Sequence, residues 1–249
     1  MSVLEVKNLA KNFGNLAAVS DVSFSVEPEE LHAVIGPNGA GKTTVFNLIS
    51  GLHAPSAGQI RFEGVEITGL APHQRVLRGI ARTFQITEIF PELTVTENLR
   101  IGVEVASGYR LFPWLGAKAA AAVREQVERL IERVGLTAKA GRLVGELSHG
   151  DQRAVEIGLA LSLRPRLLLL DEPTAGMGDQ ETEAVTELMN RLHREEHLTI
   201  VLIEHDMPLV FRLADRITVL AQGRMLANGT PRQIADNEAV QAAYLGRAE

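Results

Sequence analysis

A glycine-rich segment near the N-terminus has the residue types and the spacing that bind phosphate. It fits the pattern G-x-x-x-x-G-K-[ST] and consists of Gly36, Pro37, Asn38, Gly39, Ala40, Gly41, Lys42, Thr43 and Thr44. Glycines let the backbone curl so that several N–H groups face one anion. Lys42 would add a positive charge for the β- and γ-phosphates of a nucleotide, and the Thr43 hydroxyl suits Mg²⁺. The motif therefore predicts a nucleotide-binding site, and its full spacing argues against a chance glycine-rich turn.

Two adjacent carboxylates follow the most apolar run of the chain, at residues 167–170. They are Asp171 and Glu172. Carboxylates at the carboxyl end of a buried parallel strand face the ligand crevice of an α/β fold, so we expect Asp171 to hold Mg²⁺. Because side chains alternate along a strand, Glu172 should point the other way and polarise an attacking water. The alternative is a solvated acidic pair, which the upstream phosphate loop disfavours.

A parallel sheet would bring these two motifs together, and the sequence contains the runs for one. The phosphate loop follows an apolar run at residues 31–35 and precedes a helical pattern at residues 45–49. Continuous apolar runs at 167–170 and 199–203 are typical of strands buried on both faces. Each of these runs lies next to a helical pattern, which favours α/β winding.

The middle of the chain is predicted to be helical instead. Apolar residues recur there at helical spacing, namely Val123, Val127, Leu130, Ile131 and Val134. We interpret residues about 86–162 as an inserted subdomain, because the segment is too long for a loop. Residues about 1–85 and 163–249 then form the core of a single domain that spans 1–249. Near the C-terminus, runs at 216–220 and 224–227 flank Ala221-Gln222-Gly223 and predict a hairpin.

Composition excludes several classes of protein. The 249 residues are 45% hydrophobic and 22% charged, which is ordinary for a packed globular domain. The net charge of −6 argues against sequence-independent binding to nucleic acid. The chain has no cysteine, so a disulfide scaffold and a cysteine-ligated zinc site are ruled out. No run of about 18 apolar residues is present, so no membrane span is expected.

Further motifs make nearly the whole sequence similar to the ATPase subunits of ABC transporters. Gln85 resembles the family's Q-loop glutamine, and His205 resembles its switch histidine, which contacts the γ-phosphate. Phe13 matches the aromatic residue that stacks on adenine. The signature LSGGQ is resembled by Leu147-Ser148-His149-Gly150-Asp151-Gln152, and the D-loop by Ala175-Gly176-Met177-Gly178. The resemblance rests on the order and spacing of all these motifs together.

The resemblance implies an α/β fold: a P-loop NTPase (RecA-like) core with an N-terminal antiparallel β subdomain and an inserted α-helical subdomain carrying the signature. It also implies two ATP molecules sandwiched between two chains, with Ser148 and Gly150 acting on the partner's ATP. Glu172, His205 and Gln85 are then catalytic, Glu172 as the base. The family's Mg²⁺ ligands map onto Thr43, Gln85 and Asp171.

Three positions depart from the family pattern. His149 and Asp151 replace Gly and Gln of the signature, and Gly178 replaces the usual Asp of the D-loop. The phosphate donors Ser148 and Gly150 are retained, so we expect a working site, and Gly178 bears on the coupling between the two sites and not on ATP binding.

Two other classes of protein fit the sequence less well: an ABC ATPase of translation or DNA repair, and a P-loop kinase. The first usually has two halves or long insertions, and the second would not need the signature or the switch histidine.

Subfamily resemblance bears on the cargo. The segments 82–85, 90–99, 147–153, 203–207 and 243–246 look like the ATPases of bacterial branched-chain amino acid importers and, less closely, of urea importers and lipopolysaccharide exporters. The resemblance to the branched-chain amino acid importers implies a second ATPase chain, identical or related, and membrane permease subunits bound near Phe90 and Leu93. It also implies an indirect link to a substrate-binding protein, no nucleic acid, and a peripheral location on the cytoplasmic face of the bacterial inner membrane.

Two residue groups have a functional and a structural interpretation. The aromatic residues Tyr109, Phe112 and Trp114 could receive a partner helix, but packing within the helical subdomain is the favoured interpretation. His193 and His197 have a spacing that can bind metal. The charged residues between them instead indicate a solvated helix face without a third ligand.

Overall fold

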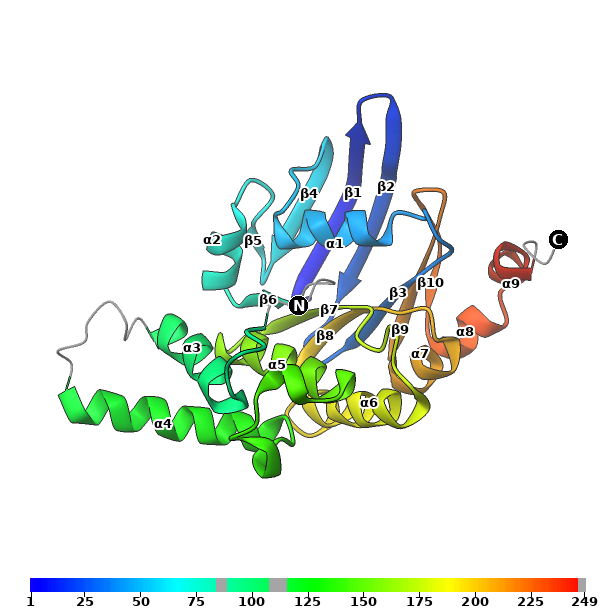
Figure 1. Cartoon of the computed structure of the whole chain (residues 1–249). Coiled ribbons are helices and arrows are strands. Elements are labelled where there is room, and N and C mark those ends of the chain that lie inside the picture. The colour runs from blue at the N-terminus through cyan, green and yellow to red at the C-terminus, as the bar shows by residue number, and fades with distance from the viewer. Residues whose placement is uncertain (84–88, 108–115, 246–249) are drawn as a thin grey trace.

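The computed structural model describes residues 1–83, 89–107 and 116–245, which form two β-sheets and surrounding helices (Figure 1). The smaller sheet is antiparallel and has the strand order β2-β1-β4-β5. Its strands are β1 (Leu4–Phe13), β2 (Leu16–Val26), β4 (Ala57–Phe62) and β5 (Val65–Glu66). This sheet is the antiparallel β part that the sequence predicts at the N-terminus.

The larger sheet has the strand order β10-β9-β3-β8-β7-β6. It consists of β3 (Leu31–Ile35), β6 (Ile80–Arg82), β7 (Leu167–Asp171), β8 (Thr199–Ile203), β9 (Arg216–Ala221) and β10 (Arg224–Gly229). All neighbours pair in parallel except β9 and β10, which form the expected hairpin. Its turn is shorter than predicted, because Ala221 still pairs with Arg224 and only Gln222 and Gly223 turn the chain. Both have positive φ angles, as such two-residue turns require.

The described helices surround this sheet (Figure 1). They are α1 (Lys42–Ser50), α2 (Pro72–Leu77), α3 (Val95–Ser107), α4 (Gly116–Arg133), α5 (His149–Ser162), α6 (Asp179–Arg194), α7 (Met207–Leu213), α8 (Pro231–Ala235) and α9 (Glu238–Leu245). Two 3₁₀ turns, Thr137–Lys139 and Val144–Glu146, precede α5. Helices α3, α4 and α5 supply the predicted helical part between β6 and β7. None of the helices in the described ranges is long and apolar enough to cross a membrane.

Successive side chains of the central strands point to opposite faces of the sheet and pack into two separate hydrophobic cores. Leu168 and Leu170 of β7 belong to the core beneath α3, α4, α5 and α6, whereas Leu167 and Leu169 belong to the core shared with α1 and the antiparallel sheet. Strands β3, β7 and β8 are buried along their whole length. This two-sided burial explains the continuous apolar runs in the sequence.

A buried arginine fixes the end of α1, and therefore the helix that follows the phosphate loop. Arg75 of α2 donates hydrogen bonds to the carbonyls of Leu48 (2.6 Å) and Ile49 (2.7 Å) in the last turn of α1. It also donates to Thr68 and Leu70. The last carbonyls of a helix lack intrahelical partners, so these bonds satisfy them. Burial lowers the pKa of Arg75 to about 10, so the side chain stays charged at neutral pH.

Candidate active site

The phosphate loop joins β3 to α1 and is bent where close backbone contacts leave no room for a side chain. Gly36 has a φ of 152°, and a Cβ there would lie 2.2 Å from the Leu220 carbonyl oxygen. Gly41 has a φ of 101°, and its Cβ would lie 2.7 Å from the Ala18 carbonyl oxygen. The glycines of the motif are therefore required by packing as well as by the curl of the loop.

Lys42 lies inside the curl of this loop. Its side chain is buried, and Nζ donates hydrogen bonds to the carbonyls of Gly36 (2.7 Å) and Pro37 (3.1 Å). Desolvation lowers the pKa of Lys42, and the nearby carboxylates of Glu172 and Asp171 oppose that shift. The ammonium group is thus held by the loop's own carbonyls, at a place where it can meet a phosphate anion.

A cavity of about 560 Å³ opens over the loop and gathers distant parts of the sequence. Its lining consists of residues 16–18, residues 38–44, Glu172, His205, Gln222 and Gly223. These come from the β2 end of the first hairpin, the phosphate loop, the carboxyl ends of β7 and β8, and the turn between β9 and β10. The structure therefore brings the phosphate loop, Glu172 and His205 together, as the sequence predicts.

Asp171 ends β7 in a buried position beside Arg82 of β6. The Arg82 Nη2 atom lies 2.8 Å from Asp171 Oδ2, and Arg82 also donates to Asn47 and Ser50. Burial raises the pKa of Asp171, and the Arg82 charge opposes this rise. The second carboxylate oxygen, Oδ1, is buried and has no hydrogen-bond partner among the described residues. A buried unpaired carboxylate oxygen of this kind indicates a position where a ligand binds.

Glu172 has a strained backbone and is paired with the imidazole of His205. Its φ is +46°, which is uncommon for a residue with a side chain. Its amide donates to the Ile203 carbonyl (2.9 Å), and Oε1 lies 2.6 Å from His205 Nε2. Strand β7 ends at Asp171, so the strand alternation that the sequence suggests does not orient Glu172, and that prediction is wrong. The left-handed turn aims it instead.

The segment that resembles the signature starts α5. Ser148 caps the helix by accepting a hydrogen bond from the Asp151 amide (3.3 Å), and Asp151 is ion-paired with Lys139. Asp151 therefore lies in the first helical turn, where a negative charge is favourable. Ser148 and Gly150 line a different cavity of about 410 Å³ and are absent from the lining of the phosphate-loop cavity. Among the described residues of one chain, these donors do not meet the phosphate loop.

Comparison with known proteins shows the family. The family model "ABC transporter" matches residues 19–175, and the model "Branched-chain amino acid ATP-binding cassette transporter" matches residues 224–249. The chain belongs to the ABC transporter ATPases. It is 43% identical to the high-affinity branched-chain amino acid transport ATP-binding protein BraF of Pseudomonas aeruginosa, over 99% of this chain and 98% of that protein.

Solved structures of ABC ATPase cassettes agree with this assignment. The ADP conformation of the cassette MJ1267 has a TM-score of 0.86 and 31% identity, and the match covers 99% of this chain and all of that one (100%). A dimeric cassette, MJ0796 bound to ADP and phosphate, has a TM-score of 0.76 and 25% identity over 92% of this chain and 99% of that one. The α/β fold predicted from sequence is thereby confirmed, and the chain is an ATP-binding cassette.

The oxygen ligands at the ABC ATPase site suit Mg²⁺. Thr43 lines the cavity. Asp171 is not part of that lining, but it ends β7 directly before Glu172, and its unpartnered Oδ1 would supply a second hard oxygen. Among the described residues, no cluster of three or more His, Cys, Asp or Glu could hold a metal by itself. Mg²⁺ commonly binds through one or two protein oxygens together with phosphates and waters, so the sparse ligand set fits it.

Other predicted residues lie outside the cavity or outside the described ranges. Phe13 is at the end of β1, with its ring against His53, and does not line the cavity, whereas Leu16 of the same hairpin does. Gln85 and the aromatic residues Tyr109, Phe112 and Trp114 fall outside the described residues.

Residues 194–196 are exposed, as the sequence predicts. His193 is buried instead of solvated, with Nε2 2.9 Å from Asp215 Oδ2, because it faces the interior from the end of α6. His197 lies beyond α6, which ends at Arg194, and pairs with Glu29, so the two histidines do not share a helix as predicted.

Sequence reasoning missed several residues of the site. Besides Arg82, Arg153 of α5 donates to the Asp171 carbonyl (2.7 Å) and so ties the signature helix to the acidic pair. Gln222 and Gly223 reach the cavity from the turn between β9 and β10. The one signal in the sequence is the position of Arg82, three residues before Gln85.

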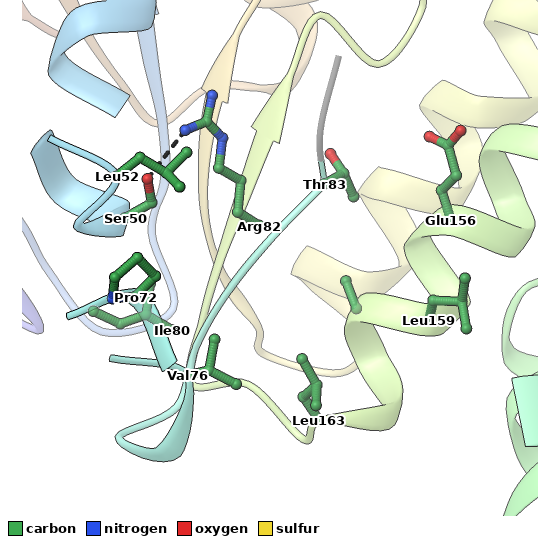
Figure 2. Close-up of a pocket in the computed structure, with 11 residues that line it drawn as sticks. Ser50, Leu52, Pro72, Val76, Ile80, Arg82, Thr83, Glu156, Leu159 and Leu163 are labelled. Atoms are coloured by element: carbon green, nitrogen blue, oxygen red, sulfur yellow. Dashed lines mark hydrogen bonds between the residues drawn. The ribbon is translucent and has the colours of Figure 1, made fainter. Parts of the chain in front are cut away.

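A second, mostly apolar cavity of about 230 Å³ is lined by residues of α1, α2, β6 and α5 (Figure 2). The lining residues are Ser50, Leu52, Pro72, Val76, Ile80, Arg82, Thr83, Glu156, Leu159, Ala160 and Leu163. Figure 2 shows Arg82 hydrogen-bonded to Ser50 at this cavity. Because Arg82 also pairs with Asp171, one side chain joins this cavity to the ATPase site.

Proposed function

We propose that this chain is the ATP-hydrolysing subunit of an importer for branched-chain amino acids. The observation that carries the proposal is the meeting of Lys42, Glu172 and His205 around one cavity. They come from the phosphate loop and from the carboxyl ends of two neighbouring parallel strands. A phosphate cradle, a carboxylate and an imidazole that face one space match the requirements of nucleotide hydrolysis.

Each residue then has a role in hydrolysis. Lys42 and the backbone N–H groups of the phosphate loop, which Pro37 alone lacks, hold the β- and γ-phosphates. Phe13, which lies outside the cavity at the end of β1, stacks on an adenine that extends beyond it. Glu172 accepts a proton from the attacking water, while His205 contacts the γ-phosphate. Mg²⁺, held by Thr43, Asp171 and Gln85, would neutralise charge on the phosphates. The strained backbone of Glu172 supports its role, since such strain concentrates at functional sites.

The active unit is a dimer in which Ser148 and Gly150 reach the ATP of the partner chain. The N-terminus of α5 has a positive helix dipole, which suits a phosphate. The Gly150 amide donates to Glu181 Oε1 (3.4 Å) within one chain and would exchange that acceptor for the partner's phosphate. Within one chain these donors line a cavity separate from the phosphate loop, and this separation supports completion of the site by a second chain. The partner is either a second copy or a related ATPase chain.

The similarity to BraF and the match of the C-terminal segment favour branched-chain amino acids as the cargo. The ATPase then works at the cytoplasmic face of a membrane, bound to permease subunits and serving a substrate-binding protein. Phe90, which is 48% exposed, and Leu93 lie in the region expected to contact the permease.

Dimer formation tests the ATPase proposal. Glu172→Gln should bind ATP and accumulate as an ATP-bound dimer, because binding is intact while hydrolysis, which would release the dimer, is slow. The oligomeric state is measured by size-exclusion chromatography with light scattering, with and without ATP. The matched control is Glu183→Gln, since Glu183 is an exposed acid of α6 paired with Arg212. A Glu172→Gln protein that stays monomeric at saturating ATP would contradict the proposal.

The cargo and the permease contact have their own tests. In cells carrying the complete transporter, uptake of labelled leucine should be competed by unlabelled branched-chain amino acids and not by urea. Competition by urea alone would reassign the cargo.

Phe90→Glu should leave ATP binding intact and weaken co-purification with the permease. Unchanged co-purification would remove Phe90 from the contact surface.

A further inference from the structure

Glu204, the residue before the switch histidine, is a buried carboxylate with an unusual set of partners. It is 4% exposed at the end of β8. Its Oε1 accepts hydrogen bonds from the Thr174 amide (3.0 Å) and the Thr174 hydroxyl (2.6 Å). Its Oε2 accepts one from the His205 amide (2.9 Å). The carboxylate thus joins the turn after β7 to the turn after β8.

Stability alone does not account for a carboxylate at this place. Among the residues that the structure describes, no ion pair forms with Glu204. Burying a carboxylate costs several kcal/mol unless its partners offset the loss of water, and here neutral donors must do so. A small neutral side chain at the end of β8 would avoid that penalty. The three hydrogen bonds therefore indicate a geometric role.

That role concerns His205, whose side chain has little packing to hold it. The His205 side chain is 43% exposed, yet Nε2 lies 2.6 Å from Glu172 Oε1. An exposed ring is oriented mainly by its backbone, and the His205 amide is fixed by Glu204. The Glu172 amide in turn donates to the Ile203 carbonyl. The turns after β7 and β8 are therefore linked at three points, and the Glu204 carboxylate is one of them.

We propose that Glu204 is a positioning residue that holds His205 against Glu172 and ties both to the root of the D-loop at Thr174. The inference rests on the proposed function, because it assumes that His205 and Glu172 act in hydrolysis. Thr174 lies directly before the segment 175–178, which resembles the D-loop. Movement of that segment would be transmitted through Glu204 to the His205 backbone.

The first test replaces the carboxylate by an amide of the same shape. In Glu204→Gln one carboxylate oxygen is replaced by an NH₂ group. This donor then faces either the His205 amide or the Thr174 amide and hydroxyl, so those hydrogen bonds are lost. We expect kcat to fall about tenfold, the equivalent of one hydrogen bond to a charged group, with KM for ATP unchanged. Glu183→Gln is the matched control and should keep the wild-type kcat. Wild-type kcat in Glu204→Gln would overturn the inference.

A double-mutant cycle separates positioning from a general structural effect. In a His205→Ala background, Glu204→Gln should have little further effect on kcat, because no imidazole remains to be positioned. An equal loss in both backgrounds would overturn the inference. If His205→Ala alone has the wild-type kcat, the proposed role of His205 fails instead. The two failures are thus distinguishable.

A milder variant covers the case in which Glu204→Gln does not fold. Thr174→Val keeps the shape of the side chain and removes only the hydroxyl donor to Glu204. We expect a fall in kcat of about threefold, smaller than for Glu204→Gln because the amide bond remains. Thr174→Ser retains the hydroxyl and should restore kcat, and a Thr174→Val protein as active as wild type would contradict the inference.

Discussion

The two ends of β3 differ in how their polar groups are paired: those at the amino end are hydrogen-bonded to one another, whereas one at the carboxyl end has no partner within the described ranges. At its amino end, buried His32 lies between Glu30 Oε1 (2.7 Å) and Thr218 Oγ1 (2.8 Å), and Thr218 Oγ1 also accepts from Asn228. We call these four residues the His32 cluster. At its carboxyl end, the phosphate loop holds Lys42 on its own carbonyls, and beside it Asp171 Oδ1 lacks a partner among the described residues.

The difference separates scaffold from function. The imidazole of the His32 cluster has both ring nitrogens paired, so the cluster should stabilise the fold and take no part in binding. The carboxyl end of the sheet instead has a strained residue, a desolvated ammonium and an unpartnered carboxylate oxygen, which a ligand would satisfy. Substitutions at the two ends should therefore change different quantities.

The largest expected effect on ATP binding is at the functional end. Lys42→Ala should weaken ATP binding by roughly 10²–10³-fold, because it removes a buried partner of the phosphates. The free energy of unfolding should change by less than about 1 kcal/mol, since two lost hydrogen bonds are offset by removal of a desolvated charge. Calorimetric titration and urea unfolding measure the two quantities. Lys7→Ala, at an exposed ion pair with Glu5, is the control. A wild-type affinity for ATP in Lys42→Ala would contradict the assignment of the carboxyl end of β3 to ligand binding.

The next effect is at the scaffold end. Thr218→Val keeps the side-chain shape but removes the hydroxyl. The Asn228 amide then loses its acceptor, and His32 Nε2 loses its hydrogen-bond partner. The free energy of unfolding should fall by about 1–3 kcal/mol, and the affinity for ATP should stay unchanged. Thr137→Val, at an exposed position, should be neutral. A loss of ATP affinity in Thr218→Val without a loss of stability would reverse the comparison.

A smaller effect concerns pH. Burial raises the pKa of Asp171, so this carboxyl gains its proton at a higher pH than an exposed one. Above that pKa the charged form lowers stability, and this penalty disappears as pH falls. The protonated carboxyl is a poor Mg²⁺ ligand, so acidification should weaken Mg²⁺-dependent ATP binding.

The measurement compares ATP affinity with and without Mg²⁺ across the acidic range. The Mg²⁺-dependent part should fall a few-fold in the wild type, by the usual linkage of protons and metal. In Asp171→Asn that part should be small and independent of pH. A Mg²⁺-dependent part that keeps its pH dependence in Asp171→Asn would assign the titration to another group.

The sequence predicts those features of the fold that are set by residues close together in the chain. The phosphate loop and the buried strands are encoded by spacing within short windows, and the runs at 31–35, 167–170 and 199–203 match the observed strands to within one residue. The contact between Arg82 and Asp171 joins residues 89 positions apart, so no local pattern could show it. The orientation of Glu172 was attributed to strand alternation, but a left-handed turn provides it. Likewise, the polar partners of Glu204 and His32 depend on tertiary packing.

The most direct test of the ATPase account is the single-turnover rate of ATP hydrolysis in Glu172→Gln. Saturating ATP and Mg²⁺ exclude a difference in binding, and Glu183→Gln serves as the control. We expect a rate lower by about 10²–10⁴-fold, the usual contribution of a general base, with the dissociation constant for ATP unchanged. Hydrolysis by Glu172→Gln at the wild-type rate would contradict the assignment of Glu172 as the base.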